Sequence, residues 1–314
     1  MVEVVGLGEI CIDWTVKVKR FPEADEKIYI EDKQIFPGGV TANFTVGLAR
    51  LGVKVAFVGG VGEDDFGRFL IKALEKEGVD TSLLLVRRGA RTPVNIIVVN
   101  EKGEKQAYMD PFLKLNVPDF HEIRDGLEKM LSEAKVLHTS AIKLQPSLEA
   151  AKIAKKKKVA VTFDLEKHVA LEYGLDGLKP LLANVDILMP NKEGLKTLTK
   201  KESLVEAAKE MLKYGPKVVV VTRGEKGSLI VHENGIIETP AFPINPVDTT
   251  GAGDAFNAGF VYAYFLRQLD LKDAAIVANA VAALKCLKLG AQTGMPRLHE
   301  VREFLQKHGF QISL

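Results

Sequence analysis

The chain contains only two cysteines in 314 residues, and its charges almost cancel. Cys11 and Cys286 lack the spacing of a metal site, so we expect reduced thiols in a cytoplasmic protein. The 43 Lys and Arg residues nearly balance the 41 Asp and Glu residues, which gives no sign of a nucleic acid or a membrane surface as partner. No apolar run is long enough to span a bilayer, and residues 2–7 are typical of a strand rather than of a signal peptide.

What the sequence does contain is an alternation of helical and strand-like segments. Extended apolar runs at residues 136–139, 159–164, 185–189 and 218–222 alternate with stretches of helical periodicity. This order predicts an α/β fold, a doubly wound and mainly parallel sheet flanked by helices. No internal repeat or low-complexity linker divides the chain, so we expect residues 1–314 to form a single domain.

Two further segments, residues 14–36 and 91–110, interrupt this alternation. In each segment, apolar and polar residues alternate before and after a β-turn, which lies at residues 22–26 in the first and at 100–103 in the second. This pattern predicts two pairs of exposed strands. The pairs form either a small β-sheet that covers a site as a lid or an ordinary set of edge hairpins.

The densest functional signal opens an apolar helix and reads Asp248-Thr249-Thr250-Gly251-Ala252-Gly253-Asp254. A hydroxyl group of Thr249 or Thr250 is predicted to cap this helix. Gly251 and Gly253 let backbone N–H groups approach a ligand closely, and the start of a helix favours an anion such as a phosphate. Asp254 is then either the acceptor of a proton from an attacking hydroxyl group or only a first-turn acid that complements the helix dipole.

This stretch resembles the second signature of the ribokinase-like carbohydrate kinases, the phosphofructokinase-B family. The first signature is similar to Pro37-Gly38-Gly39-Val40-Thr41-Ala42-Asn43, which on its own would be a glycine turn with Thr41 or Asn43 as a helix cap. The resemblance implies a ribokinase-like fold and transfer of the γ-phosphoryl group of ATP, with Mg²⁺, to a hydroxyl group of a small carbohydrate. It implies that Asp254 is the general base. It also implies that the amides of Gly251, Ala252 and Gly253 form the anion hole.

The same resemblance implies which residues bind the substrate. Asp13, which follows the first strand, and Asn43 are expected to bind sugar hydroxyl groups, because carboxylate and amide groups suit such partners. Gly38 and Gly39 are expected to bring the backbone against the substrate. The lid is implied to cover this site and to form a homodimer.

Three later segments are implied to bind the nucleotide. Asn191 follows a strand, and Thr222, Gly224 and Gly227 lie in a loop between two strands. Asn279 is a polar residue within an apolar helix, where it either makes an interhelical hydrogen bond or lies near the adenine.

The implied metal residues are Glu193, Asp248 and Thr250. Glu193 stands one position before the usual family Glu, where this chain has Gly194. Asp248 and Thr250, together with the loop at residues 289–294, are implied to hold a monovalent cation such as K⁺, because oxygen ligands suit a hard cation.

Two other glycine patterns are incomplete nucleotide motifs. Gly6 and Gly8 begin a dinucleotide-binding fingerprint, but Cys11 stands at the third glycine position and no helix follows. Residues 62–69 have the glycine spacing of a P-loop but lack its Lys and its Ser or Thr.

The particular substrate is open at this point. Val40 and Cys11 stand where ribokinases usually carry Lys and Asn, and residues 8–13 look more like fructokinases and 2-keto-3-deoxygluconate kinases. A nucleoside kinase of the same family is an alternative, and the lid residues able to stack on a base are Trp14, Phe36 and Tyr108. Lys167 and His168 are candidates for reaching the phosphates. A sugar- or nucleotide-binding regulator on the same fold is the non-catalytic alternative.

Overall fold

The computed structural model of the protein describes residues 1–101 and 105–314. A nine-stranded sheet runs through its centre in the order β13-β12-β11-β10-β9-β8-β1-β4-β5. The strands from β11 to β5 in this order are parallel to their neighbours, whereas β12 and β13 are antiparallel. In chain order the strands are β1 (Val4–Leu7), β4 (Val55–Gly62), β5 (Asp80–Arg87), β8 (Val136–Thr139), β9 (Ala160–Leu165), β10 (Ile187–Pro190), β11 (Val218–Thr222), β12 (Ser228–His232) and β13 (Gly235–Thr239).

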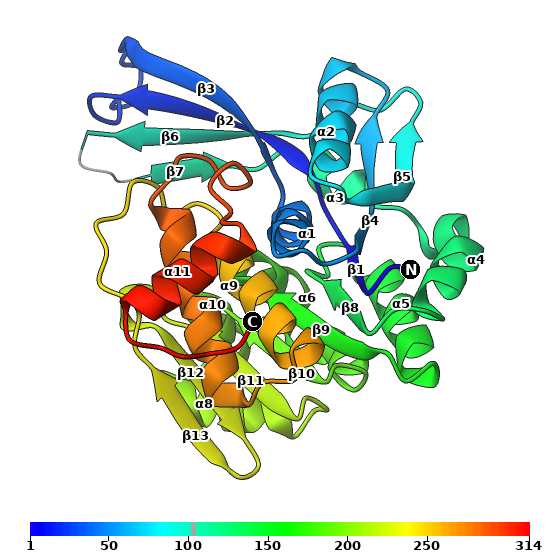
Figure 1. The fold of residues 1–314 in the computed structure, drawn as a ribbon. Coiled ribbons are helices and arrows are strands. Elements are labelled where there is room, and N and C mark those ends of the chain that lie inside the picture. Colours follow the sequence, from blue (N-terminus) through cyan, green and yellow to red (C-terminus); the bar gives the residue numbers. More distant parts are fainter. Residues whose placement is uncertain (102–104) are drawn as a thin grey trace.

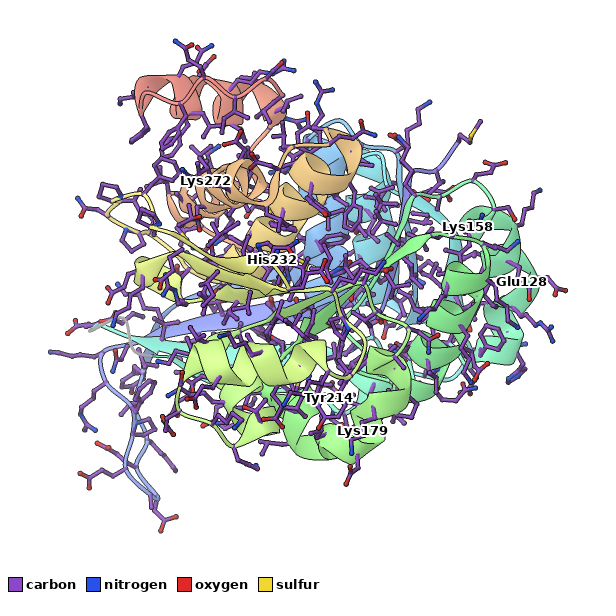
Figure 2. All side chains as sticks on the ribbon, turned by 90° about the horizontal axis from the view of Figure 1, so that it is seen from below. Glu128, Lys158, Lys179, Tyr214, His232 and Lys272 are labelled. Carbon is purple, nitrogen blue, oxygen red and sulfur yellow. The ribbon has the colours of Figure 1, made fainter. Side chains whose placement is uncertain are left out.

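Helices cover both faces of this sheet. On one face are α1 (Val40–Arg50), α2 (Asp65–Lys76), α9 (Ala252–Val261), α10 (Leu271–Cys286) and α11 (Leu298–Lys307). On the other face are α4 (Phe120–Leu131), α5 (Leu144–Lys156), α6 (Lys167–Leu182), α7 (Lys192–Thr199) and α8 (Leu204–Leu212). In Figure 2, Lys272 of α10 and Lys179 of α6 lie on opposite sides of the strands.

Helices can pack on both faces of the sheet because successive side chains of a strand point to opposite faces. In β11, Val218 and Val220 pack with the first set of helices, while Val219 and Val221 pack with the second. A strand buried on both faces needs apolar residues at every position, which explains its continuous valine run. The predicted doubly wound, mainly parallel sheet is therefore confirmed.

A second sheet of four strands projects from the main body at the upper left of Figure 1. Its order is β3-β2-β6-β7, and its strands are β2 (Cys11–Val18), β3 (Ile30–Gly38), β6 (Val94–Asn100) and β7 (Lys105–Tyr108). The predicted strand pairs thus join into one small sheet, because β2 and β6 pair in parallel. Residues 102–104 of the predicted turn at 100–103 and of the predicted lid segment 91–110 lie outside the described residues.

Helix α1 begins at Val40, directly after Gly39. Helix α6 is kinked at Gly174, which has φ 59°. A short α3 (Phe112–Leu115) links the small sheet to α4. No helix of the described residues is both long and apolar enough to cross a membrane.

Candidate active site

The glycine turn before α9 is the first part of the site. Gly251 is the N-cap residue, with φ 79°, and among the described residues no side-chain capping hydrogen bond is found at this helix start. The predicted cap by Thr249 or Thr250 is therefore wrong, because the chain enters the helix through a left-handed residue that only glycine adopts easily. The N–H of Thr250 instead donates to Asp248 Oδ1 at 2.9 Å.

The two glycines of this turn have different surroundings. A Cβ atom on Gly251 would lie 2.8 Å from the Cβ of Ala291, whereas one on Gly253 would meet no atom of the described residues within 4 Å. The N–H of Ala252 already donates to the Thr249 carbonyl at 3.1 Å, so it serves the turn itself. The open space beside Gly253, next to the positive end of α9, is where an anion can approach the helix start.

Asp254 lies on the first turn of α9 and is only 8% exposed. Its Oδ2 accepts a hydrogen bond of 2.7 Å from Asn43 Nδ2 on α1, across 211 positions of the sequence. The Oδ1 atom of Asn43 is buried and has no hydrogen-bond partner among the described residues. Because α1 packs directly against α9, the two signature stretches form one site, and an unsatisfied acceptor remains beside the carboxylate.

Burial raises the pKa of Asp254 well above its usual range, and the negative charges of Glu166, Glu9 and Asp13 raise it further. The hydrogen bond from Asn43 acts in the opposite direction, because it stabilises the ionised carboxylate. A general base works best when its pKa lies near the working pH. The raised pKa of Asp254 brings this group closer to neutral pH than a solvated Asp.

The sequence did not reveal the other buried acids near Asp254. Glu9 accepts hydrogen bonds from Ser140 Oγ at 2.5 Å and from Thr41 Oγ1 at 3.3 Å. Asp164 is the second-last residue of β9 and accepts a hydrogen bond of 2.9 Å from Asn257 Nδ2. Burial raises the pKa of both acids. Two features of the sequence could have indicated these acids. Asp164 stands near the end of a predicted strand, and Asn257 follows Asp254 by three residues, which places both on one face of the helix.

The predicted substrate residues Asp13, Gly38, Gly39 and Asn43 lie together. Asp13 is buried on β2, and a Cβ atom on Gly38 would overlap its carboxylate. Gly39 has φ 97° and caps α1, and a Cβ atom there would lie 2.6 Å from the Cα of Ile10. The first signature therefore needs glycine so that β3 can pass Asp13 closely and deliver Asn43 to Asp254.

The predicted nucleotide loops lie next to one another at the carboxyl ends of β10 and β11. A parallel bridge pairs Asn191 with Thr222, and Gly224 and Gly227 adopt φ 61° and 78° in the turn between β11 and β12. A groove beside them is lined by Lys192, Lys196, Glu202, Leu204, Arg223, Glu225 and Lys226. The basic side chains there outnumber the acids, which suits a polyphosphate.

Asn279 has a structural role in α10. Its Nδ2 donates to Ser228 Oγ at 3.3 Å, to the Thr239 carbonyl at 3.4 Å and to the Pro240 carbonyl at 3.3 Å. These bonds attach the helix to the end of the β12–β13 hairpin, which is the hydrogen-bonding alternative considered for this residue. They leave its predicted place near the adenine as a proposal.

The predicted metal residues do not form a single cluster. Glu193 is 59% exposed in the first turn of α7 and lies 3.4 Å from Lys192 Nζ, while Asn191 Oδ1 caps that helix by accepting from Gly194 N at 2.6 Å. Asp248 and Thr250 lie in the loop before α9. Within the described part of the chain, no three His, Cys, Asp or Glu side chains gather as metal ligands. A magnesium ion that arrives with nucleotide phosphates fits such a site, because it needs only one or two protein carboxylates.

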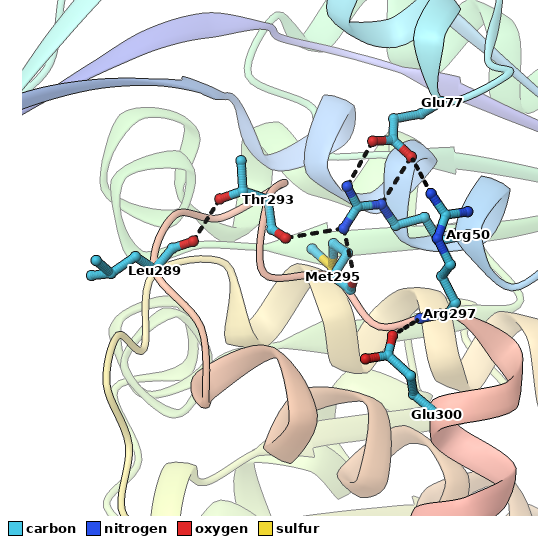
Figure 3. A network of polar contacts seen from close by, with 7 residues as sticks. All are labelled: Arg50, Glu77, Leu289, Thr293, Met295, Arg297 and Glu300. Atoms are coloured by element: carbon cyan, nitrogen blue, oxygen red, sulfur yellow. Dashed lines mark hydrogen bonds and ion pairs between the residues drawn. The ribbon is translucent and has the colours of Figure 1, made fainter.

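The loop at residues 289–295 closes the back of the glycine turn. Gly290 N donates to Asp248 Oδ2 at 2.8 Å, and Lys285 Nζ, which is fully buried, donates to the Asp248 carbonyl at 2.7 Å. Figure 3 shows the outer side of this loop, where Arg50 donates to the carbonyls of Thr293 at 3.1 Å and Met295 at 2.6 Å. Arg50 is itself paired with Glu77 at 2.6 Å, so α1 and α2 anchor the loop.

Comparison with known proteins agrees with this geometry. Residues 1–298 match the family described as pfkB family carbohydrate kinase. An uncharacterized sugar kinase of Archaeoglobus fulgidus is 34% identical over 80% of this chain and 99% of its own length. A 5-dehydro-2-deoxygluconokinase of Clostridium perfringens is 29% identical over 97% of this chain and 93% of its own length.

Solved structures show the same fold. The ribokinase of Arabidopsis thaliana, in complex with ribose and ATP, superposes with a TM-score of 0.84 at 26% identity, covering 98% of this chain and 99% of that one. A putative ribokinase II of E. coli, in complex with ATP and Mg²⁺, gives a TM-score of 0.83 at 25% identity, covering 98% and 100%. The chain therefore belongs to the pfkB family of carbohydrate kinases, and it is a phosphotransferase with an alcohol group as acceptor.

Proposed function

We propose that the protein transfers the γ-phosphoryl group of ATP to a hydroxyl group of a small neutral sugar, with Asp254 as the general base. The observation that carries this proposal is the buried carboxylate of Asp254, held by Asn43 one residue from the open space at Gly253. A substrate hydroxyl bound between Asp13 and Asn43 would donate its proton to Asp254 as it attacks. The N–H groups of Gly251 and Gly253 would stabilise the charge that grows on the transferred group, while the N–H of Ala252 holds the turn together.

ATP and Mg²⁺ are the proposed donor and cofactor. The groove beside Asn191, Thr222, Gly224 and Gly227 offers basic side chains to the phosphates, and the E. coli relative in complex with ATP and Mg²⁺ supports the assignment. Magnesium supplies charge neutralisation between the phosphates when it is bound. Of the residues proposed for metal, we assign the exposed Glu193 to the magnesium ion, because it neighbours Lys192 of the basic groove. The two free, buried cysteines and the use of ATP favour the cytoplasm.

The charges around Asp254 favour a neutral polyol, as in a fructokinase, over a sugar acid, as in a 2-keto-3-deoxygluconate kinase. Glu9, Asp164 and Glu166 interact electrostatically with Asp254 or with one another, and whether ionised or protonated they offer no positive charge to pair with a substrate carboxylate. His168 lies 3.3 Å from Glu166, but burial lowers the pKa of His168, so it adds little positive charge at neutral pH.

We further propose that the small sheet is a lid through which two chains form a homodimer. The register across its strands places Ile35, Trp14, Ile96 and Tyr108 in one row on one face. Ile35, Ile96 and Tyr108 are exposed. The opposite face carries Asp13 of the proposed sugar site, so the apolar row points away from that site and is available to a second copy.

The experiment that tests the function measures ADP release with ATP and Mg²⁺ against pentoses, hexoses, keto-deoxy sugar acids, inositols and nucleosides. We expect turnover with a neutral sugar and a KM at least about tenfold higher for the matching sugar acid, since each 1.4 kcal/mol of repulsion corresponds to tenfold. Preference for a nucleoside would establish the alternative kinase. Binding of these compounds without turnover would overturn the proposal in favour of a regulator.

A further inference from the structure

Lys285 is the most unusual buried side chain outside the proposed reacting groups. It lies in the last turn of α10 and is 0% exposed, among the largest fully buried side chains of the described residues. Lysine is almost never fully buried unless its charge is paired. Its partners in the structure belong to Asp248, the first residue of the glycine-turn signature.

The ammonium group sits among oxygen atoms. Lys285 Nζ donates to the Asp248 carbonyl at 2.7 Å and lies 3.7 Å from Asp248 Oδ2. A Cβ atom on Gly294 would lie 2.8 Å from the Gly290 carbonyl oxygen, 3.0 Å from that of Lys285 and 3.1 Å from Lys285 Cε. The end of the side chain and these carbonyl groups therefore meet behind the loop at residues 289–294, the segment implied to hold K⁺ together with Asp248 and Thr250.

We infer that the ammonium group of Lys285 is a built-in cation that takes the place of a monovalent metal ion behind the glycine turn. A carbonyl oxygen and a carboxylate are the ligands that such an ion would need, and here a covalently attached ammonium already meets both. A K⁺ ion close to Asp248 would also be repelled by this charge, so the residues present do not fit the ion.

The position of Lys285 explains what the charge would do. Asp248 accepts from Thr250 N and Gly290 N, and Gly251 packs against Ala291, so one carboxylate ties the loop to the glycine turn. Arg50 holds the same loop from its outer side (Figure 3). Lys285 is thus a positioning residue, which neutralises Asp248 and fixes the turn whose N–H groups face the phosphoryl group in the proposed reaction.

The test compares the wild type with Lys285→Ala and with Lys288→Ala, an exposed lysine of the same segment that pairs with Glu300. Turnover and thermal unfolding are measured in KCl, NH₄Cl and tetramethylammonium chloride at equal ionic strength. We expect the same turnover and the same Tm in all three salts for the wild type and for Lys288→Ala. Lys285→Ala should lose on the order of a hundredfold in kcat, because the turn is misplaced, and regain part of it in KCl or NH₄Cl but not in the bulky salt.

Several outcomes would overturn the inference. One is a wild-type turnover or Tm that rises specifically with K⁺, and another is a Lys285→Ala variant that equals the wild type in tetramethylammonium chloride. If Lys285→Ala does not fold, the inference is tested on the wild type alone, by the salt series and by a measurement of Tl⁺ binding. Binding of Tl⁺ to the wild type would contradict the inference. The inference rests on the proposed function, but Tm and Tl⁺ binding need no substrate, so they remain decisive even if no sugar is phosphorylated.

Discussion

At the scale of single residues, the burial of Asp254 lowers the free energy of unfolding at neutral pH but suits the carboxylate to its proposed role as general base. Burial and neighbouring acids raise the pKa of this carboxyl group in the folded chain. The unfolded chain therefore loses the proton at a lower pH than the folded chain does. As pH rises from the unfolded pKa toward the folded one, the free energy of unfolding falls, and the loss persists above that range. A group that destabilises the fold at neutral pH and lies one residue from the open space at Gly253 is expected to be functional.

Replacement of Asp254 by Asn should therefore lower activity without lowering stability. We expect kcat to fall by about a hundred- to ten-thousand-fold, because the general base is lost. The Tm at pH 7 should equal or exceed that of the wild type, since the amide oxygen can still accept from Asn43. Steady-state kinetics and calorimetry measure both quantities. Asp273→Asn, which changes a first-turn acid of α10, is the control and should keep full activity. Near-normal turnover of Asp254→Asn would leave Asp254 as a dipole-complementing acid only.

The pH profile of kcat/KM offers a second test at this scale. The rate should fall as acid protonates Asp254, and the acid limb should lie above the pH expected for a solvated Asp. Asn43→Ala removes the bond that lowers the pKa of Asp254, so its limb should move to higher pH. Glu166→Gln removes a charge that raises this pKa, so its limb should move to lower pH. Identical limbs in the two variants would show that another group titrates.

At the scale of the element, the start of α9 contains two glycines with separable roles. Gly251→Ala should destabilise the protein by about 1–3 kcal/mol, because its left-handed φ and the contact with Ala291 both oppose a side chain. Gly253→Ala should leave stability unchanged or raise it by up to about 1 kcal/mol, because the space is open and alanine favours a helix. Its methyl group should nevertheless raise the KM for ATP. Urea unfolding and ATP titration together test the pair, and equal stability of the two variants would contradict it.

The same element shows how far the sequence could be read. The glycines, Asp254 and the helix itself were predictable, because glycine freedom and helical periodicity are local properties. The cap was not, because the chain enters α9 through a left-handed Gly251 packed against Ala291, a neighbour that is distant in the sequence. The buried acids Glu9 and Asp164 were missed for the same reason, since only the packed sheet brings them near Asp254.

The wider fold shows the same limit. The alternation that predicts a parallel sheet comes from strands buried on both faces, such as β11. Strand β5 was not predicted, because it is only half-buried at the edge of the sheet and mixes polar with apolar residues. Helix α11 was also missed, although Leu298, Val301 and Leu305 have helical spacing, because all its other residues except Phe304 are charged or polar.

At the scale of the whole molecule, the proposed dimer predicts a mass change from one surface substitution. Ile96→Lys places a charge in the centre of the apolar row on the lid, so it should convert a dimer into a monomer. Light scattering after size-exclusion chromatography measures this. Ile236→Lys, an equally exposed apolar residue on β13, is the control and should remain dimeric. A wild type that elutes as a monomer at micromolar concentration would rule out the lid dimer.

The sheet order has a consequence for how the molecule forms. Strand β1 comes first in the sequence, yet it lies between β4 and β8, and its second neighbour ends at Thr139. During vectorial synthesis β1 can pair with β4 early, but its other edge stays unpaired until β8 has emerged. The free N–H and C=O groups of that edge can pair with a strand of another chain, so the nascent amino-terminal part is exposed to aggregation until β8 is made.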